Sequence, residues 1–154
     1  MNELKIENLS KHYGKKAALN NVSITFTDGI YGLLGPNGAG KSTLMNIVTQ
    51  NISADIGGGI FWNGKKTSAL GVKFRSLIGF MPQQKELYPT FTAERFVGYL
   101  AALKGIPPKE IKGEVARVLS LVELSDCANK KIGGFSGGMK QRVLIAQALL
   151  GDPK

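Results

Sequence analysis

The segment 35–43 has the composition of a loop that binds phosphate groups. It reads Gly-Pro-Asn-Gly-Ala-Gly-Lys-Ser-Thr and matches the pattern G-x-x-x-x-G-K-[ST]. Glycines lack a Cβ, so successive backbone N–H groups can turn toward phosphate oxygens, and the N-terminus of a following helix adds a positive dipole. Lys41 would place its ammonium on the terminal phosphates, and the Ser42 hydroxyl would hold Mg²⁺. The pattern therefore predicts a site for a nucleoside triphosphate.

The residues on either side of this segment predict the strand and the helix that such a loop needs. The apolar run 30–34 before it predicts a short strand, and the stretch from Thr43 to Gln50 is compatible with a helix. A glycine-rich turn that merely connects a strand to a helix is the alternative, but it does not account for Lys-Ser in this register. The residues predicted to hold phosphates and Mg²⁺ are Gly35, Asn37, Gly38, Gly40, Lys41, Ser42 and Thr43.

Length and composition indicate one domain, or one piece of a larger one. The chain has 154 residues, with 20 Lys and Arg against 11 Asp and Glu, which gives a net charge of +9. The basic residues are scattered and no basic run is interleaved with aromatic residues, so we do not expect a nucleic-acid surface. No apolar run approaches the ~18 residues that span a bilayer, and a single cysteine, Cys127, excludes an internal disulfide. We therefore expect a cytosolic chain.

The hydrophobic pattern predicts strands followed by a block of helices. The expected strands lie within residues 3–27 around a turn near Gly14, at 60–62, and at 77–81 before Pro82. The expected helices follow a cap at Thr92, the pair Pro107-Pro108, and Ser136. This order indicates an α/β nucleotide-binding core with a helical insertion.

A second motif, at residues 135–142, narrows the choice of family. It reads Phe-Ser-Gly-Gly-Met-Lys-Gln-Arg and precedes an apolar stretch with helical spacing. Ser136 and the amides of Gly137 and Gly138 would lie where a helix begins, which makes an anion site, with a simple Ser N-cap as the alternative. The motif resembles the signature of ATP-binding cassette (ABC) proteins, whose usual form is Leu-Ser-Gly-Gly-Gln. The phosphate loop upstream stands in the order that this family shows.

The resemblance covers essentially the whole chain and implies roles for further residues. In this family the signature residues bind the ATP of a second copy, so two domains enclose two nucleotides head to tail. The segment from Ile78 to Gln83 resembles the family's Q-loop. Gln83 would then approach Mg²⁺ and the attacking water and report to a membrane partner, although Gln84 beside it leaves the assignment open. The resemblance makes Gln83 and Lys41 the catalytic residues.

The neighbouring residues Tyr13 and His12 have different expected roles. Tyr13 matches the position whose aromatic ring stacks on adenine in the family, and such stacking contributes roughly 1–3 kcal/mol. The only histidine, His12, has no base or nucleophile partner that the sequence identifies, so we expect a surface residue.

The fold implied by the resemblance is a P-loop NTPase core of the α/β class, incomplete at its C-terminus. An N-terminal antiparallel β subdomain and a helical subdomain would accompany it in a single nucleotide-binding domain, 1–154. About 1–85 would form the β and P-loop core, about 86–135 the helical subdomain, and 136–154 the signature helix.

Two departures and the residues after the signature bear on the subfamily. Phe135 replaces the usual Leu, and Met139 replaces the usual Gln, which removes an amide while the Ser and Gly donors remain. Met-Lys-Gln-Arg is most similar to the ABC-2-type exporter ATPases, which work with a separate permease. The resemblance thus implies an ATP-binding subunit, peripheral on the cytoplasmic face of a membrane, that couples ATP–Mg²⁺ binding and hydrolysis to export. Its expected partners are a second nucleotide-binding domain and a permease, without nucleic acid.

Two alternatives stay beside this interpretation. ABC-type ATPases also act on ribosomes or nucleic acid without a membrane partner, typically with paired cassettes or long insertions that this sequence lacks. The other alternative is a non-catalytic fragment that only binds nucleotide or a partner subunit. Co-purification with a permease, rather than with RNA or DNA, would separate transport from the first alternative.

The sequence stops at Lys154, where the family continues into a strand that ends in Asp-Glu, the Walker B pair. In the family these carboxylates bind Mg²⁺ and polarise the attacking water. We therefore expect the 154-residue chain to hydrolyse ATP negligibly, because a general base alone contributes about 10²–10⁴-fold to the rate. Phosphate release by the purified chain tests this expectation. Sustained turnover that the substitution Lys41→Ala abolishes would contradict it.

Overall fold

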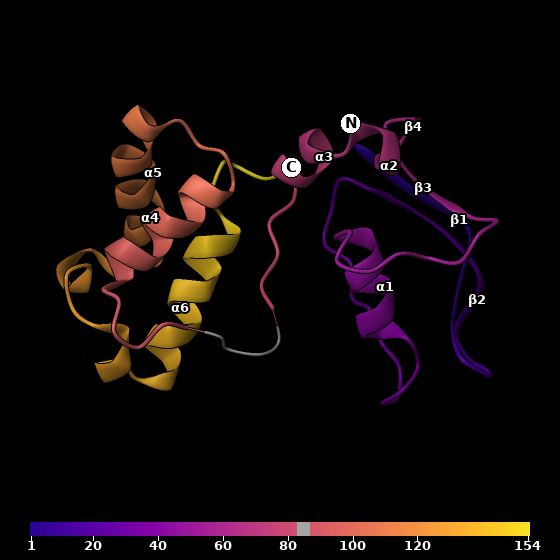
Figure 1. Ribbon diagram of the computed structural model, residues 1–154, viewed down its shortest axis with the longest axis horizontal. Coiled ribbons are helices and arrows are strands. Elements are labelled where there is room, and N and C mark those ends of the chain that lie inside the picture. Colours follow the sequence, from indigo (N-terminus) through magenta and orange to yellow (C-terminus); the bar gives the residue numbers. More distant parts are fainter. Residues whose placement is uncertain (83–86) are drawn as a thin grey trace. The chain divides into compact units, whose positions relative to one another are not determined.

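The computed structural model describes residues 1–82 and 87–154, and these form two compact units, Met1–Arg75 and Ser76–Lys154. Figure 1 shows strands and helix α1 in the first unit, and helices α4, α5 and α6 in the second. Each unit has an apolar core of its own. In the described part of the chain, no helix combines the length and the apolar character needed to span a bilayer.

The first unit contains an antiparallel sheet in the order β2-β1-β3-β4. Its strands are β1 (Glu3–Tyr13), β2 (Lys16–Thr27), β3 (Gly59–Trp62) and β4 (Lys65–Lys66). The predicted turn is confirmed, because Gly14 adopts φ +58° between β1 and β2. Asn8 also has a positive φ, and the pairing register shifts there. As a result Ile6 and Leu9, three positions apart, are both buried against the core.

Helix α1 (Lys41–Val48) packs its apolar side chains against this sheet. The core of the first unit consists of Ile6, Leu9, Leu19, Leu44, Ile47 and Ile60. Burial of each such side chain contributes about 1.5–3 kcal/mol relative to leaving it exposed. Two short helices, α2 (Thr67–Leu70) and α3 (Val72–Ser76), follow the sheet. Phe74 of α3 is buried, and the centre of its ring lies 6.3 Å from that of Trp62, so α3 packs against the end of β3.

Two strand predictions are wrong. Residues 30–34 and 77–81 contain no strand, and the side chains of Ile30 and Leu34 are exposed. A strand needs a neighbour that pairs with its N–H and C=O groups, and within the described part of the chain neither run has one. Apolar composition marks a segment that favours burial, but it does not supply the pairing partner.

The second unit is built from helices. They are α4 (Ala93–Leu103), α5 (Pro108–Leu121) and α6 (Gly137–Ala148), with short 3₁₀ helices η1 (Ser125–Cys127) and η2 (Ile132–Gly134). The predicted cap at Thr92 is confirmed, because its Oγ1 accepts a hydrogen bond from the Arg95 N–H at 3.1 Å. The predicted helix start after the two prolines is confirmed as well. The core includes Phe96, Val97, Val115, Val118, Leu119, Val143 and Leu150.

Lys104, at the C-terminal end of α4, connects two other segments of this unit. Its ammonium donates hydrogen bonds to the carbonyl oxygens of Leu150 and Ile78, the latter at 3.1 Å. Leu150 follows the last turn of α6, where unpaired carbonyl groups carry partial negative charge that favours a cation. Partial burial lowers the pKa of Lys104. The side chain therefore links the end of α6 to the segment 77–81.

Glu114 of α5 holds the residues that follow α6. Its carboxylate accepts hydrogen bonds from Nε and Nη2 of Arg117 at 2.8 and 2.7 Å, and from the Gly151 N–H at 2.7 Å. Arg117 also donates to the carbonyl oxygen of Leu149 at 3.0 Å. The hydrogen bond from Arg117 lowers the pKa of Glu114, and the Gly151 amide and the nearby positive charges act in the same direction. The C-terminal end of α6 is thus held by charge-assisted hydrogen bonds.

The segment 77–81 lies close to this same end of α6. A Cβ on Gly79 would overlap the carbonyl oxygen of Ala148 and would lie 2.9 Å from Cγ of Pro153. The Lys154 N–H donates to the carbonyl oxygen of Leu77 at 2.9 Å. Backbone contact, rather than strand pairing, therefore holds the segment.

We expect Gly79→Ala to lower the free energy of unfolding of the chain by about 1–3 kcal/mol, because the added methyl group overlaps backbone that must move. Gly98→Ala is the matched control. Gly98 lies within α4, and the nearest atoms to a Cβ there are 3.8 Å away. Alanine at that position should stabilise the helix by about 0.5–1 kcal/mol. Urea titrations followed by circular dichroism measure both changes, and equal shifts in the two variants would contradict the close approach at Gly79.

Glu114→Gln should lower the free energy of unfolding by about 1–3 kcal/mol at pH 7, because it replaces charge-assisted hydrogen bonds with weaker ones. Since the pKa of Glu114 is lowered in the folded chain, its stabilisation is present above the ordinary value of 4.5 and is lost as the pH falls through the lowered pKa. The difference between wild type and Glu114→Gln should therefore shrink in acid. Glu110→Gln, at an exposed position of the same helix, should change stability by less than about 0.5 kcal/mol. A difference that stays constant with pH would contradict the assignment.

Candidate nucleotide-binding site

In the structure, the phosphate loop ends at Gly40, a position where any other residue would be strained. Gly40 is the N-cap of α1 and adopts φ +86°. A Cβ at this position would overlap the carbonyl oxygen of Ala18 and would lie 2.9 Å from Cδ2 of Leu19, both in β2. Gly38, with φ +84°, forms the turn before it. These conformations direct the chain from the loop into the first turn of α1.

Helix α1 begins at Lys41, two residues before the predicted start, so the lysine and Ser42 lie in its first turn. The Lys41 ammonium donates to the carbonyl oxygens of Gly35 and Pro36 at 2.6 and 2.8 Å. The loop thus curves around this cation. The first N–H groups of a helix have no intrahelical acceptor, so they and the ammonium form a site that suits phosphate oxygens.

Tyr13 lies at the end of β1, beside the turn that leads into β2. Its side chain is 53% exposed, and the Lys11 ammonium is 5.6 Å from the centre of its ring. In the pairing of the two strands, Lys11 is opposite Leu19 and His12 is opposite Ala17. Ala18, which Gly40 contacts, lies between those two residues of β2. The structure therefore brings the predicted base-stacking residue and the phosphate loop to the same end of the first unit.

The signature residues belong to the second unit. Ser136 is the N-cap of α6, and its Oγ accepts a hydrogen bond from the Met139 N–H at 3.3 Å. Gly137 and Gly138 are exposed, and no atom lies within 4 Å of the position of a Cβ on either of them. Phe135 before them is buried in the helical core and so anchors this helix start. The predicted helix start is therefore confirmed, with Ser136 as its cap and Gly137 and Gly138 in its first turn, while Gln83 lies outside the described residues.

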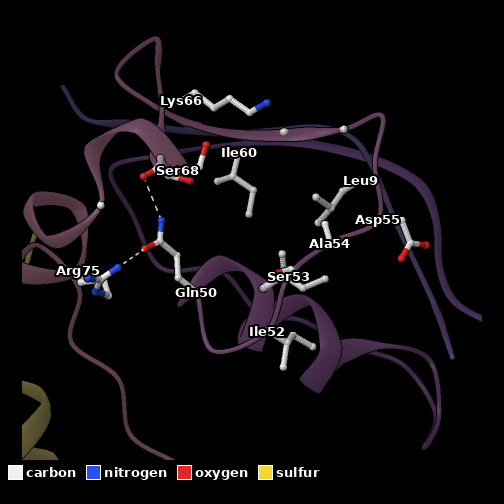
Figure 2. Close-up of a pocket in the computed structure, with 15 residues that line it drawn as sticks. Leu9, Gln50, Ile52, Ser53, Ala54, Asp55, Ile60, Lys66, Ser68 and Arg75 are labelled. Atoms are coloured by element: carbon white, nitrogen blue, oxygen red, sulfur yellow. Dashed lines mark hydrogen bonds between the residues drawn. The ribbon is translucent and has the colours of Figure 1, made fainter.

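A cavity of about 350 Å³ lies elsewhere in the first unit, between the C-terminal end of α1 and the sheet. Figure 2 shows Gln50 at one side of it, where the Gln50 amide donates to the carbonyl oxygen of Thr67 at 3.0 Å and accepts from Arg75 at 3.2 Å. Asp55 lies at another side. No residue of the phosphate loop lines this cavity, so it is separate from the predicted nucleotide site.

His12 is exposed, as expected of a surface residue, but it also has a side-chain partner that the sequence did not identify. Its Nδ1 lies 2.7 Å from Oδ2 of Asp55, which belongs to the loop after α1. The two residues are 43 positions apart, so no local sequence motif could have predicted the pair. This contact connects His12, the residue before Tyr13, to the loop that follows the C-terminal end of α1.

Comparisons with known proteins identify the family to which the chain is similar. Residues 19–154 match the family described as ABC transporter. The linearmycin resistance ATP-binding protein LnrL of Bacillus subtilis (strain 168) is 39% identical over 98% of this chain and 49% of its own length. The lantibiotic transport ATP-binding protein SrtF of Streptococcus pyogenes is 36% identical over 98% of this chain and 63% of its own length. The sulfate/thiosulfate import ATP-binding protein CysA of Mesostigma viride is 35% identical over 97% of this chain and 42% of its own length.

A solved structure gives the same result for the fold. The dimeric post-hydrolysis state of the ATP-binding cassette MJ0796, bound to ADP and Pi, matches with a TM-score of 0.80 at 32% identity, over 97% of this chain and 70% of that one. The expected cassette fold is therefore confirmed. The chain spans about half the length of LnrL. With a family match over residues 19–154, two glycine-rich helix starts in the expected order and a cassette fold, this chain belongs to the ABC transporter family of ATP-binding proteins.

Proposed function

We propose that this chain is the ATP-binding part of an ABC transporter that exports its substrate through a separate permease. The observation that carries the proposal is the phosphate loop, in which Gly40 packs against β2 and the loop carbonyl groups surround the Lys41 ammonium. Family membership and the cassette fold support the same assignment.

Phosphate binding uses the first turn of α1. Lys41 leaves the carbonyl oxygens of Gly35 and Pro36 and donates to the terminal phosphates, while the loop amides cradle the remaining oxygens. The Ser42 hydroxyl, exposed beside them, provides an oxygen ligand of the kind that Mg²⁺ prefers. Among the described residues, no group of three or more His, Cys, Asp or Glu side chains is placed to hold a metal ion. Bound Mg²⁺ neutralises phosphate charge.

Residues that precede and follow this loop in the sequence contact the base and the attacking water in our proposal. Tyr13 is half-exposed at the same end of the sheet and stacks on the adenine. By its resemblance to the family's Q-loop, Gln83 would contact Mg²⁺ and the attacking water and would report to the membrane partner. Hydrolysis is proposed for the whole protein, since the relatives are longer than this chain, and binding alone for the 154 residues.

The second anion site serves the nucleotide of another copy. Ser136, Gly137 and Gly138 present a capped helix start with exposed amides. The dimeric state of MJ0796 bound to ADP and Pi supports a pair of cassettes. In this arrangement each copy supplies the phosphate loop of one nucleotide and the signature of the other.

Export rests on subfamily resemblance. The names of LnrL and SrtF refer to resistance and lantibiotic transport, which supports an exporter. The name of CysA refers to import, so the names alone do not decide the direction. The residues Met-Lys-Gln-Arg after the signature glycines favour the ABC-2-type exporter ATPases, and the chain acts at the cytoplasmic face of the membrane beside its permease.

The substitution Lys41→Ala tests the nucleotide assignment. We expect it to weaken ATP–Mg²⁺ binding about 10- to 100-fold, because it removes charge-assisted hydrogen bonds to the phosphates. Isothermal titration calorimetry measures the affinity, and circular dichroism verifies that the variant is folded. Lys109→Ala, an exposed lysine in the first turn of α5, is the matched control and should bind like the wild type. Unchanged ATP affinity in a folded Lys41→Ala chain would refute the proposed site.

A further inference from the structure

Asp55 is connected to three consecutive residues of β1, immediately before Tyr13. Its backbone N–H donates to the carbonyl oxygen of Ser10 at 2.9 Å. Its carboxylate lies 3.9 Å from the Lys11 ammonium and accepts from Nδ1 of His12 at 2.7 Å. In Figure 2 its carboxylate points away from the cavity that Leu9 and Ala54 line. These contacts join the end of β1 to the loop that follows α1.

This junction has a counterpart at the other end of α1. Gly40, at the start of the helix, packs against Ala18 in the strand paired with β1. Asp55, beyond the end of the helix, binds the last residues of β1 itself. The end of the β1–β2 hairpin is therefore held from two sides by the segment that contains the phosphate loop and α1.

The hairpin needs such support because its own pairing is irregular near Tyr13. The register between β1 and β2 shifts between Leu9 and Lys11, and again between Lys11 and His12. The residues from His12 to Ala17 are exposed, so little packing holds them. Irregular, exposed strand ends open readily, and a side-chain contact there determines the position of the turn more than it would in the middle of a sheet.

We infer that the His12–Asp55 pair positions Tyr13 for the nucleotide base. The pair keeps the end of β1 against the loop after α1, so that the Tyr13 ring is presented at a set place relative to the phosphate loop. This inference rests on the base-stacking role proposed for Tyr13. His12 and Asp55 are positioning residues, since neither needs to touch the nucleotide.

The charges around the pair favour its persistence. The hydrogen bond from His12 lowers the pKa of Asp55, and the Lys11 ammonium acts in the same direction, so the carboxylate stays ionised at neutral pH. An imidazole can donate from Nδ1 either as the cation or as the neutral Nδ1–H tautomer. An ionised Asp55 carboxylate can therefore accept a hydrogen bond from either of these forms of the imidazole.

The test compares two probes, ATP–Mg²⁺ and inorganic tripolyphosphate–Mg²⁺, which has no base. We expect His12→Ala and Asp55→Ala each to weaken ATP binding about three- to tenfold, a part of the full stacking contribution, and to leave tripolyphosphate affinity within about twofold. The double variant should be no weaker than either single variant. His12→Asn, which retains a donor near the place of Nδ1, should restore ATP affinity. Glu7→Gln breaks the Lys5–Glu7 ion pair of the same strand and is the matched control, with no expected effect on either probe.

Tyr13→Ala separates failure of this inference from failure of the proposed function. If Tyr13→Ala weakens ATP but not tripolyphosphate binding, while His12→Ala and Asp55→Ala change neither, the positioning role is overturned and the base role stands. If His12→Ala weakens both probes equally, the pair has a general structural role and the inference is overturned. If Tyr13→Ala leaves ATP affinity unchanged, the base role fails and the inference fails with it.

Discussion

The close approach of Gly40 to the carbonyl oxygen of Ala18 is the contact on which the candidate site depends. Glycine is required there twice, for its φ of +86° and for the space that a Cβ would occupy. Because Ala18 lies in β2 beside the end of β1, this contact determines where the phosphate loop lies relative to Tyr13. In a nucleotide, covalent bonds limit the distance between the base and the phosphates. A site that binds both must therefore hold Tyr13 and the phosphate loop at a matching distance.

In the second unit, the glycine-rich start of α6 is held by contacts at both ends of that helix. Buried Phe135 and the Ser136 cap position the N-terminus of α6, whereas charged side chains from α4 and α5 hold its C-terminal end. The apolar core in between carries the helix as a rigid element. The position of the signature residues therefore depends on contacts at both ends of α6. At the C-terminal end, Lys104 and Arg117 donate to carbonyl groups of Leu150 and Leu149, 46 and 32 positions further along the chain.

Features that depend on neighbouring residues could be predicted from the sequence, and those that depend on distant partners could not. The phosphate loop, the hairpin turn and the helix starts at Thr92 and Ser136 each follow from a few adjacent residues. The runs 30–34 and 77–81 were wrongly predicted as strands because pairing requires a second segment. The His12–Asp55 contact joins residues 43 positions apart and has no local pattern. Gly79 is intermediate, because a glycine within an apolar run is a recognised signal of close backbone approach.

In the proposed site, phosphate and base are recognised by parts of the chain with unequal rigidity. Phosphate recognition uses backbone amides whose geometry follows from glycine conformations and from the start of a packed helix. Base recognition uses one half-exposed ring at the end of an irregular hairpin. Stacking on an aromatic ring discriminates poorly between bases, so the position of that ring affects affinity more than selectivity. Substitutions in β1 or in the loop after α1 could therefore tune nucleotide affinity while the phosphate loop stays intact.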